Sequence, residues 1–126
     1  MVLYEGESGK RTIGNKPALT KLLAVCPLIS VAPGDFLGIF CGQVRYVEEK
    51  PPKAIKGPFP GLWLDHSEIT GKLNQMRVAK SGEKTNVCLA WEWVNEAKEG
   101  KCSPYWRVLV IATREIMPFG QLIRPP

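Results

Sequence analysis

Two long apolar runs dominate the pattern of hydrophobic and polar positions along the chain. Residues 105–113, YWRVLVIAT, contain the run VLVIA, which is typical of a strand buried on both faces. Residues 86–95, NVCLAWEWVN, alternate apolar and polar positions, and one face of the predicted strand carries Val87, Leu89, Trp91 and Trp93. The two runs predict an antiparallel hairpin with residues 96–104 as its loop.

Turn-forming residues divide the N-terminal half into shorter elements. Residues 32–35, APGD, predict a turn, because proline and glycine supply its fixed and permissive φ angles. Residues 36–47 predict a strand, in which Gly38 and Gly42 indicate a bulge or the close approach of another backbone. Residues 17–31 fit either a short helix or an apolar strand, and periodicity does not choose between them.

Short elements separate these strands. Residues 48–61, EEKPPKAIKGPFPG, combine four prolines with three lysines and predict an exposed loop without regular structure. Residues 62–64 predict a short strand that ends in the polar turn of residues 65–68, DHSE. Residues 121–123 predict one last short strand.

The composition agrees with a fold of short strands. The 12 glycines and 11 prolines favour frequent turns over a helical bundle, so we expect a mainly β fold with few or no helices. The length of 126 residues fits one domain. Residues 1–16 are polar and glycine-rich and predict a flexible lead-in, which leaves residues 17–126 as the domain.

Cysteine usage and hydropathy indicate an intracellular protein, nuclear or cytoplasmic. No two of the four cysteines have C-x-x-C spacing, and the single histidine, His66, lies near none of them in sequence, so no metal site is predicted. Cys26, Cys41 and Cys88 lie among apolar residues and predict buried free thiols, which suit a reducing compartment. The first ten residues carry no secretory signal, and no apolar run approaches the roughly 20 residues of a membrane span.

Six short segments follow one another in an order that resembles the SET domain of protein lysine methyltransferases. That family has an I-x-x-G-(D/E) turn, a Y-x-G-E strand, a central G-N-x-x-R-F-I-N-H-S-C-x-P-N motif and an A-x-R-x-I-x-x-G-E-E-L-x-x-D-Y end. The matching segments here are residues 29–35 (ISVAPGD), 40–43 (FCGQ), Gly71, 86–87 (NV), 112–116 (ATREI) and 119–122 (FGQL). The resemblance covers roughly residues 20–124 and implies a SET-like fold of short curved sheets.

The departures from the family pattern concern the residues that perform its chemistry. Residues 18–26 contain no glycine where the family has the G-x-G segment that holds S-adenosylmethionine. Residues 76–81, MRVAKS, replace the N-H-S-C core, and no tyrosine follows Leu122, where the family has its catalytic one. The resemblance therefore implies the fold without methyl transfer, with no catalytic residue and no cofactor expected.

The altered central motif also affects the end of the chain. In the family the C-terminal segment passes under a loop made by that motif, a crossing known as the pseudoknot. Here we expect the pseudoknot to be incomplete, with the last residues loose or packed against another copy. The oligomeric state stays open, a homodimer included.

Candidate binding residues lie on the predicted hairpin and on the long loop. Trp91, Trp93, Tyr105 and Trp106 would form either an aromatic cage for methyl-lysine or ordinary cross-strand packing. In the loop, proline-rich chain is pre-ordered for partner contact, and the candidates there are Lys50, Lys53, Lys56 and Phe59. Residues 65–68 contain Asp, His and Ser, but neighbours on a strand face opposite ways, so a turn is favoured over a catalytic triad.

Three functional hypotheses remain. The leading one is a non-catalytic SET-like domain that serves as a protein-binding or structural module. The second is an S-adenosylmethionine-dependent protein lysine methyltransferase with an unusual cofactor pocket. The third is a small basic β domain that binds nucleic acid or another acidic partner, since the net charge is +5. Without a tight Lys/Arg cluster, the third has only the net charge in its favour.

Overall fold

The protein is mainly β, as its sequence predicts. The computed structural model describes residues 3–7, 11–13, 16–18, 23–69, 71–95 and 103–126, with side chains described from Val25 onward. It has 44% strand and 4% helix, and its small sheets are mostly antiparallel and form no closed barrel among the described residues. The helical segment of the described chain is a 3-10 turn, η1, Lys72–Gln75.

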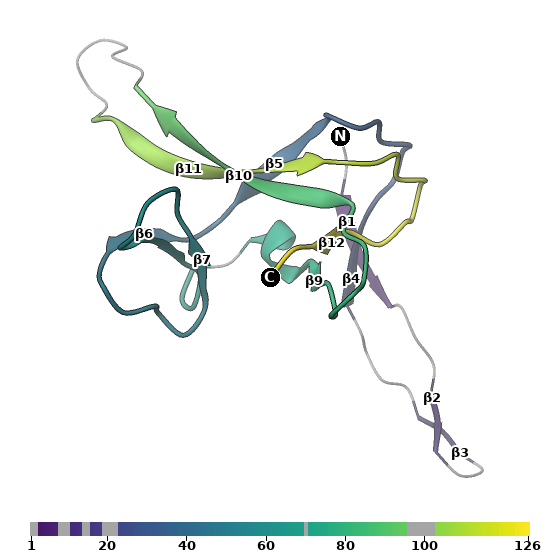
Figure 1. Cartoon of the computed structure of the whole chain (residues 1–126). Coiled ribbons are helices and arrows are strands. Elements are labelled where there is room, and N and C mark those ends of the chain that lie inside the picture. Colours follow the sequence, from purple (N-terminus) through teal and green to yellow (C-terminus); the bar gives the residue numbers. More distant parts are fainter. Residues whose placement is uncertain (1–2, 8–10, 14–15, 19–22, 70, 96–102) are drawn as a thin grey trace.

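The central sheet has three antiparallel strands in the order β10 (Val87–Val94), β11 (Tyr105–Ala112), β5 (Phe36–Phe40) (Figure 1). The predicted hairpin is confirmed, because β10 and β11 pair along their whole lengths. The pairing of β11 with β5 shifts register between Val110 and Ile111, opposite Gly38, which has φ +152°. The bulge predicted at this glycine is therefore present.

The predicted strand of residues 36–47 is two strands that belong to different sheets. After β5 the chain turns at Gly42 and continues as β6 (Gln43–Tyr46), which pairs with β8 (Leu62–Asp65). A Cβ at Gly42 would lie 2.7 Å from Cγ of Leu64, so only glycine allows the chain to pass this close to β8. Apolar residues continue through the turn at Gly42, so the sequence pattern predicts one strand instead of two.

The prediction of an irregular loop over residues 48–61 is wrong in its middle. Residues 54–56 form β7 (Ala54–Lys56), which pairs with the second edge of β8. Ile55 faces Leu64 in this pairing and is buried, so one apolar residue anchors the proline-rich segment to the sheet. The strand predicted at residues 62–64 is confirmed and is one residue longer.

The N-terminal segment contains more structure than a flexible lead-in. Strand β1 (Leu3–Glu7) pairs antiparallel with β4 (Leu23–Pro27), and β2 (Arg11–Ile13) pairs with β3 (Lys16–Ala18). The ambiguous stretch of residues 17–31 thus forms a strand where it meets β1. The segment predicted as a lead-in thus includes a strand, Leu3–Glu7, whose backbone pairs with β4.

The C-terminal residues pack against their own chain. Strand β12 (Ile123–Arg124) pairs in parallel with β9 (Arg77–Val78), and Leu122, fully buried, donates its backbone N–H to the carbonyl of Val25. The Asn86 side chain donates to the carbonyl of Gln121 and accepts from the N–H of Ile123. The expectation of loose C-terminal residues is therefore corrected.

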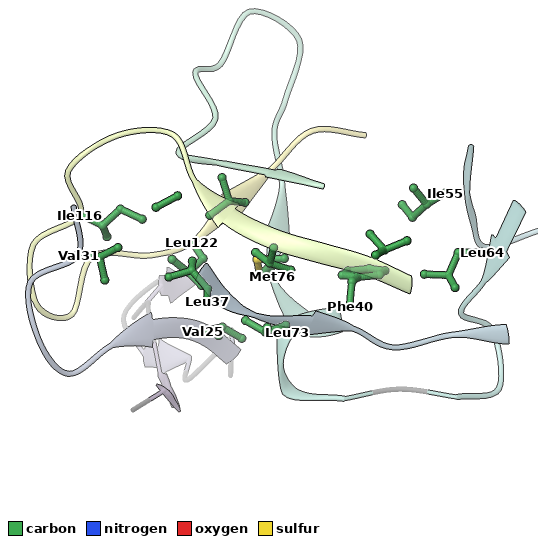
Figure 2. Close-up of a cluster of buried hydrophobic side chains, with 14 residues drawn as sticks. Val25, Val31, Leu37, Phe40, Ile55, Leu64, Leu73, Met76, Ile116 and Leu122 are labelled. Carbon is green, nitrogen blue, oxygen red and sulfur yellow. The ribbon is translucent and has the colours of Figure 1, made fainter. Parts of the chain in front are cut away.

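One apolar core connects the sheets with η1 and the C-terminal segment (Figure 2). It draws on β4, β5, β8, β11 and η1, and its most buried members include Val25, Phe40, Val108, Val110 and Leu122. In β11, Val108 and Val110 are buried, whereas Leu109 and Ile111 are half-buried. The VLVIA run is thus buried fully on one face only.

Asn74 connects η1 to the turn between β5 and β6. Its Oδ1 accepts from the backbone N–H groups of Cys41 and Gly71, both at 3.0 Å, and its Nδ2 donates to the carbonyl of Cys41 at 2.7 Å. Three backbone groups therefore depend on one side chain.

We expect Asn74→Ala to lower the free energy of unfolding by about 1–3 kcal/mol, because it leaves these partly buried groups of Cys41 and Gly71 without partners. Urea denaturation measures the change. The exposed neighbouring Gln75→Ala is the control and should stay within about 0.5 kcal/mol of the unmodified chain. Equal stability of the two variants would contradict the role assigned to Asn74.

Candidate functional site

Four aromatic side chains lie together near the C-terminal end of β10 and the N-terminal end of β11. We call them the aromatic surface: Phe59, Trp91, Trp93 and Trp106. Trp106 is at its centre, with ring centroids 5.1 Å from Trp93, 6.0 Å from Trp91 and 6.1 Å from Phe59. All three contacts are edge-to-face, the arrangement that the ring quadrupoles favour. Trp93 and Trp106 are direct cross-strand partners, while Phe59 comes from the segment after β7.

The aromatic surface stays partly open to solvent. Trp93 is 49% exposed and Phe59 is 44% exposed. The indole N–H of Trp91 donates to the carbonyl of Lys56 at 3.0 Å, which holds the end of β7 against β10. The structure thus brings together Phe59 and the three tryptophans that the sequence singled out, with Lys56 next to them.

The geometry of these rings matches packing better than a methyl-lysine cage. A cage needs ring faces set apart around a cation. Here Trp106 is in edge contact with each of its neighbours, which is the arrangement of rings packed against one another.

An apolar pocket of about 270 Å³ adjoins Trp106. It lies where β5, β6, β8 and β11 meet, and its lining includes Ile39, Val44, Leu64, Ile69 and Val108. Ile39 is 38% exposed and Ile69 49%, so apolar side chains are open to solvent here as well. The aromatic surface and this apolar pocket share Trp106.

A second, basic pocket lies beside β12. It has a volume of about 430 Å³, and its lining includes Lys53, His66, Ser67, Asn74 and Arg124. A smaller pocket of about 240 Å³ shares Lys53, His66 and Arg124 and extends to Lys50. Lys50 and Lys53, both predicted as partner contacts, therefore line the basic pockets, whereas Lys56 adjoins the aromatic surface.

Arg124 is the buried charge of this basic pocket. The residue is 8% exposed, and its guanidinium carbon lies 5.3 Å from the centroid of the Phe40 ring. Nη1 donates to the carbonyl of Pro125 at 3.0 Å, whereas the buried Nε has no hydrogen-bond partner. Burial lowers the pKa of Arg124 below its ordinary value, because the charged form loses solvation. Sequence reasoning missed this residue, since an arginine near a chain end is usually solvated.

His66 lies next to this charge. Its ring meets the Phe40 ring edge-on at 5.3 Å. Burial, followed by the positive charges of Arg124 and Lys53, lowers the pKa of His66 below its ordinary 6.5. The imidazole is therefore neutral at pH 7.

Residues 65–68 form no catalytic triad. The Ser67 hydroxyl donates to Asp65 Oδ1 at 2.6 Å, and Arg45 Nε donates to Asp65 Oδ2 at 2.8 Å. Ser67 thus bonds directly to the acid, whereas a triad would place histidine between the two. The bonds from Ser67, with a smaller contribution from Arg45, lower the pKa of Asp65 to about 2.

The thiols and other metal-ligating residues form no cluster. Among the described residues no group of three or more His, Cys, Asp or Glu side chains could hold a metal ion. Cys26 is buried as predicted, but Cys41 and Cys88 are only half-buried, and Cys102 lies outside the described residues. No helix within the described ranges has the length and apolar character needed to cross a membrane.

Comparison with known proteins identifies no relative: no family model matches the chain, and no curated protein matches its sequence. The SET resemblance therefore stays a prediction, carried by the motifs quoted above.

We expect the unfolding free energy to fall as the pH is lowered from about 5 to 2. In the folded protein Asp65 and Glu83 each have a pKa of about 2, against ordinary values of 3.8 and 4.5. For Glu83 the main cause is its paired bonds with Arg77. A carboxyl with a depressed folded pKa adds stability above its ordinary pKa, and this stability is lost as the pH falls through the folded value.

Thermal melts across this range measure the effect. The double variant Asp65→Asn, Glu83→Gln should be less stable at pH 7 and should show a shallower loss on acidification. A slope equal to that of the unmodified chain would show that other groups govern acid unfolding.

Proposed function

We propose that this chain is a SET-like domain that binds another protein through the aromatic surface and the apolar pocket, and that it does not transfer methyl groups. The observation that carries the proposal is the exposure of Trp93 and Phe59, at 49% and 44%, around a fixed central Trp106. Exposed tryptophans packed beside an apolar pocket are typical of the centre of protein interfaces.

The packing of the rings supports a binding role, because it pre-orders them. Edge contacts with Trp106 restrict Trp93 and Phe59 before any partner arrives, and the bond to the carbonyl of Lys56 restricts Trp91. Side chains that are already ordered lose little conformational entropy on association. Aromatic side chains that served only to stabilise the fold would not need to be exposed to solvent.

The charge around the aromatic surface favours an acidic partner. Lys56 is exposed beside Trp91, and the chain as a whole carries a net charge of +5. On the opposite face of the hairpin, Glu92 is paired with Arg107 at 2.6 Å, so its charge is compensated. A protein segment that carries apolar and acidic side chains fits both properties.

The SET-like part of the proposal rests on the order of six matching motif segments. Its non-catalytic part rests on three other segments that depart from the family pattern. Residues 18–26 lack the family's glycines, residues 76–81 lack N-H-S-C, and residues 123–126 lack tyrosine.

Calorimetric titration with S-adenosylmethionine tests the non-catalytic part. We expect no binding heat at micromolar protein and ligand, because no glycine segment provides the close backbone approach that the cofactor needs. Micromolar affinity would instead support the methyltransferase hypothesis.

The double variant Phe59→Ala, Trp93→Ala tests the binding part. Both side chains are half-exposed, so the variant should fold, and the thermal midpoint checks that it does. We expect the dissociation constant for a protein partner, first obtained by affinity capture and then measured with purified components, to rise about tenfold or more.

Phe36→Ala is the matched control, since Phe36 is 54% exposed and pairs with Ile111 at the other end of the sheet. It should bind as the unmodified chain does. Unchanged affinity of the double variant, or competition by nucleic acid alone, would reject the aromatic surface as the protein-binding site.

A further inference from the structure

The described structure contains one buried guanidinium without a carboxylate partner. Arg45, Arg77 and Arg107 each pair with an acid, at 2.8, 2.6 and 2.6 Å. None of the ion pairs among the described residues includes Arg124, although Arg124 is the most buried of these arginines at 8% exposed. A buried charge is costly unless a counter-charge or hydrogen bonds compensate for it.

The partners that Arg124 does have compensate only in part. The Pro125 carbonyl accepts from Nη1, and the Phe40 ring provides a cation–π contact at 5.3 Å. The Nε group is buried and has no acceptor. Buried polar groups in native proteins almost always have a partner, and the described residues do not use every donor of this guanidinium.

The pocket that Arg124 lines contains further basic and polar side chains. Lys53, His66, Ser67 and Asn74 line the same cavity of about 430 Å³, and Lys50 lines the smaller one that adjoins it. No Asp or Glu side chain lines either cavity. Asp65, which precedes His66 in the chain, is already engaged by Ser67 and Arg45.

We propose that the basic pocket binds an oxyanion, the carboxylate or phosphate group of a small ligand, with Arg124 as its main contact and Lys53 as the second. Arg124 offers a planar set of N–H donors that matches either group. The cavity exceeds a single oxyanion in volume, and Met76 and Val78 in its lining provide apolar contact for the rest of the ligand. This inference is independent of the aromatic surface, which lies on other residues.

His66 reports on the pocket without any label, because it is the only histidine in the chain. The charged groups that act on it are Arg124 and Lys53, which lower its pKa, and Asp65, which raises it. An anion bound next to His66 stabilises the imidazolium, so its pKa rises on binding. By linkage, the anion binds more tightly as the pH falls through the titration of His66.

The experiment follows the imidazole proton resonances of His66 by NMR during pH titration of the full chain. Sulfate serves as the phosphate-like probe, because its charge does not change in this range, and acetate serves as the carboxylate probe. Sodium chloride at the same ionic strength corrects for screening of Lys53 and Arg124. We expect sulfate, acetate or both to raise the pKa of His66 above its value in chloride, with a saturable dependence on concentration.

Three variants assign the effect to the pocket. Arg124→Gln and Lys53→Gln should each weaken binding of the responding probe about tenfold or more, as expected when a charged hydrogen bond is lost. Arg114→Gln removes the same charge from an exposed arginine that lines neither cavity, and should bind as the unmodified chain does.

Two results would overturn the proposal. One is an identical pKa of His66 in sulfate, acetate and chloride. The other is equal affinity in Lys53→Gln and Arg114→Gln. Lys53 is exposed, so its variant decides the question even if loss of the buried Arg124 prevents folding. Which probe responds more strongly identifies the ligand group as phosphate-like or carboxylate.

Discussion

The structure depends on burying one face of β11. This strand pairs along one edge with its neighbour in the chain and along the other edge with a strand distant in sequence. Val108 and Val110 are fully buried, and their strand gains backbone partners from β10, its hairpin neighbour, and from β5, about seventy residues earlier. The local hairpin costs little chain entropy, whereas the β5 pairing closes a long loop and needs the core to compensate. Phe40, Leu122 and Val25 supply that core from three separate segments, as Figure 2 shows for the labelled side chains.

Because the sheets are small, side-chain amides complete much of the backbone hydrogen bonding between them. Asn74 satisfies three backbone groups at the turn between two sheets, and Asn86 joins the C-terminal strand to the start of β10. Asn74 lies in η1, and Asn86 directly precedes β10. A fold of short strands needs such bridges, since buried N–H and C=O groups without partners are costly.

The two proposed binding regions use different chemistry and have different sequence signals. The aromatic surface was foreseeable in part: Trp91, Trp93 and Trp106 lie on adjacent predicted strands, so their proximity follows from the hairpin register. The contact of Phe59 with Trp106 does not follow from that register, because it depends on the pairing of β7 with β8. The basic pocket had no visible signal, since Lys53, His66 and Arg124 meet only through packing around Phe40.

The sequence by itself determined the mainly β class, the hairpin of β10 and β11, and a bulge or close approach at Gly38 and Gly42. These features depend on alternation of apolar residues and on glycine, which act over a few neighbours. Only the tertiary structure decided that residues 36–47 divide between two sheets, that β7 forms within a proline-rich segment, and that Arg124 is buried. Each of these depends on contacts with residues distant in sequence, whose free energy outweighs local preference.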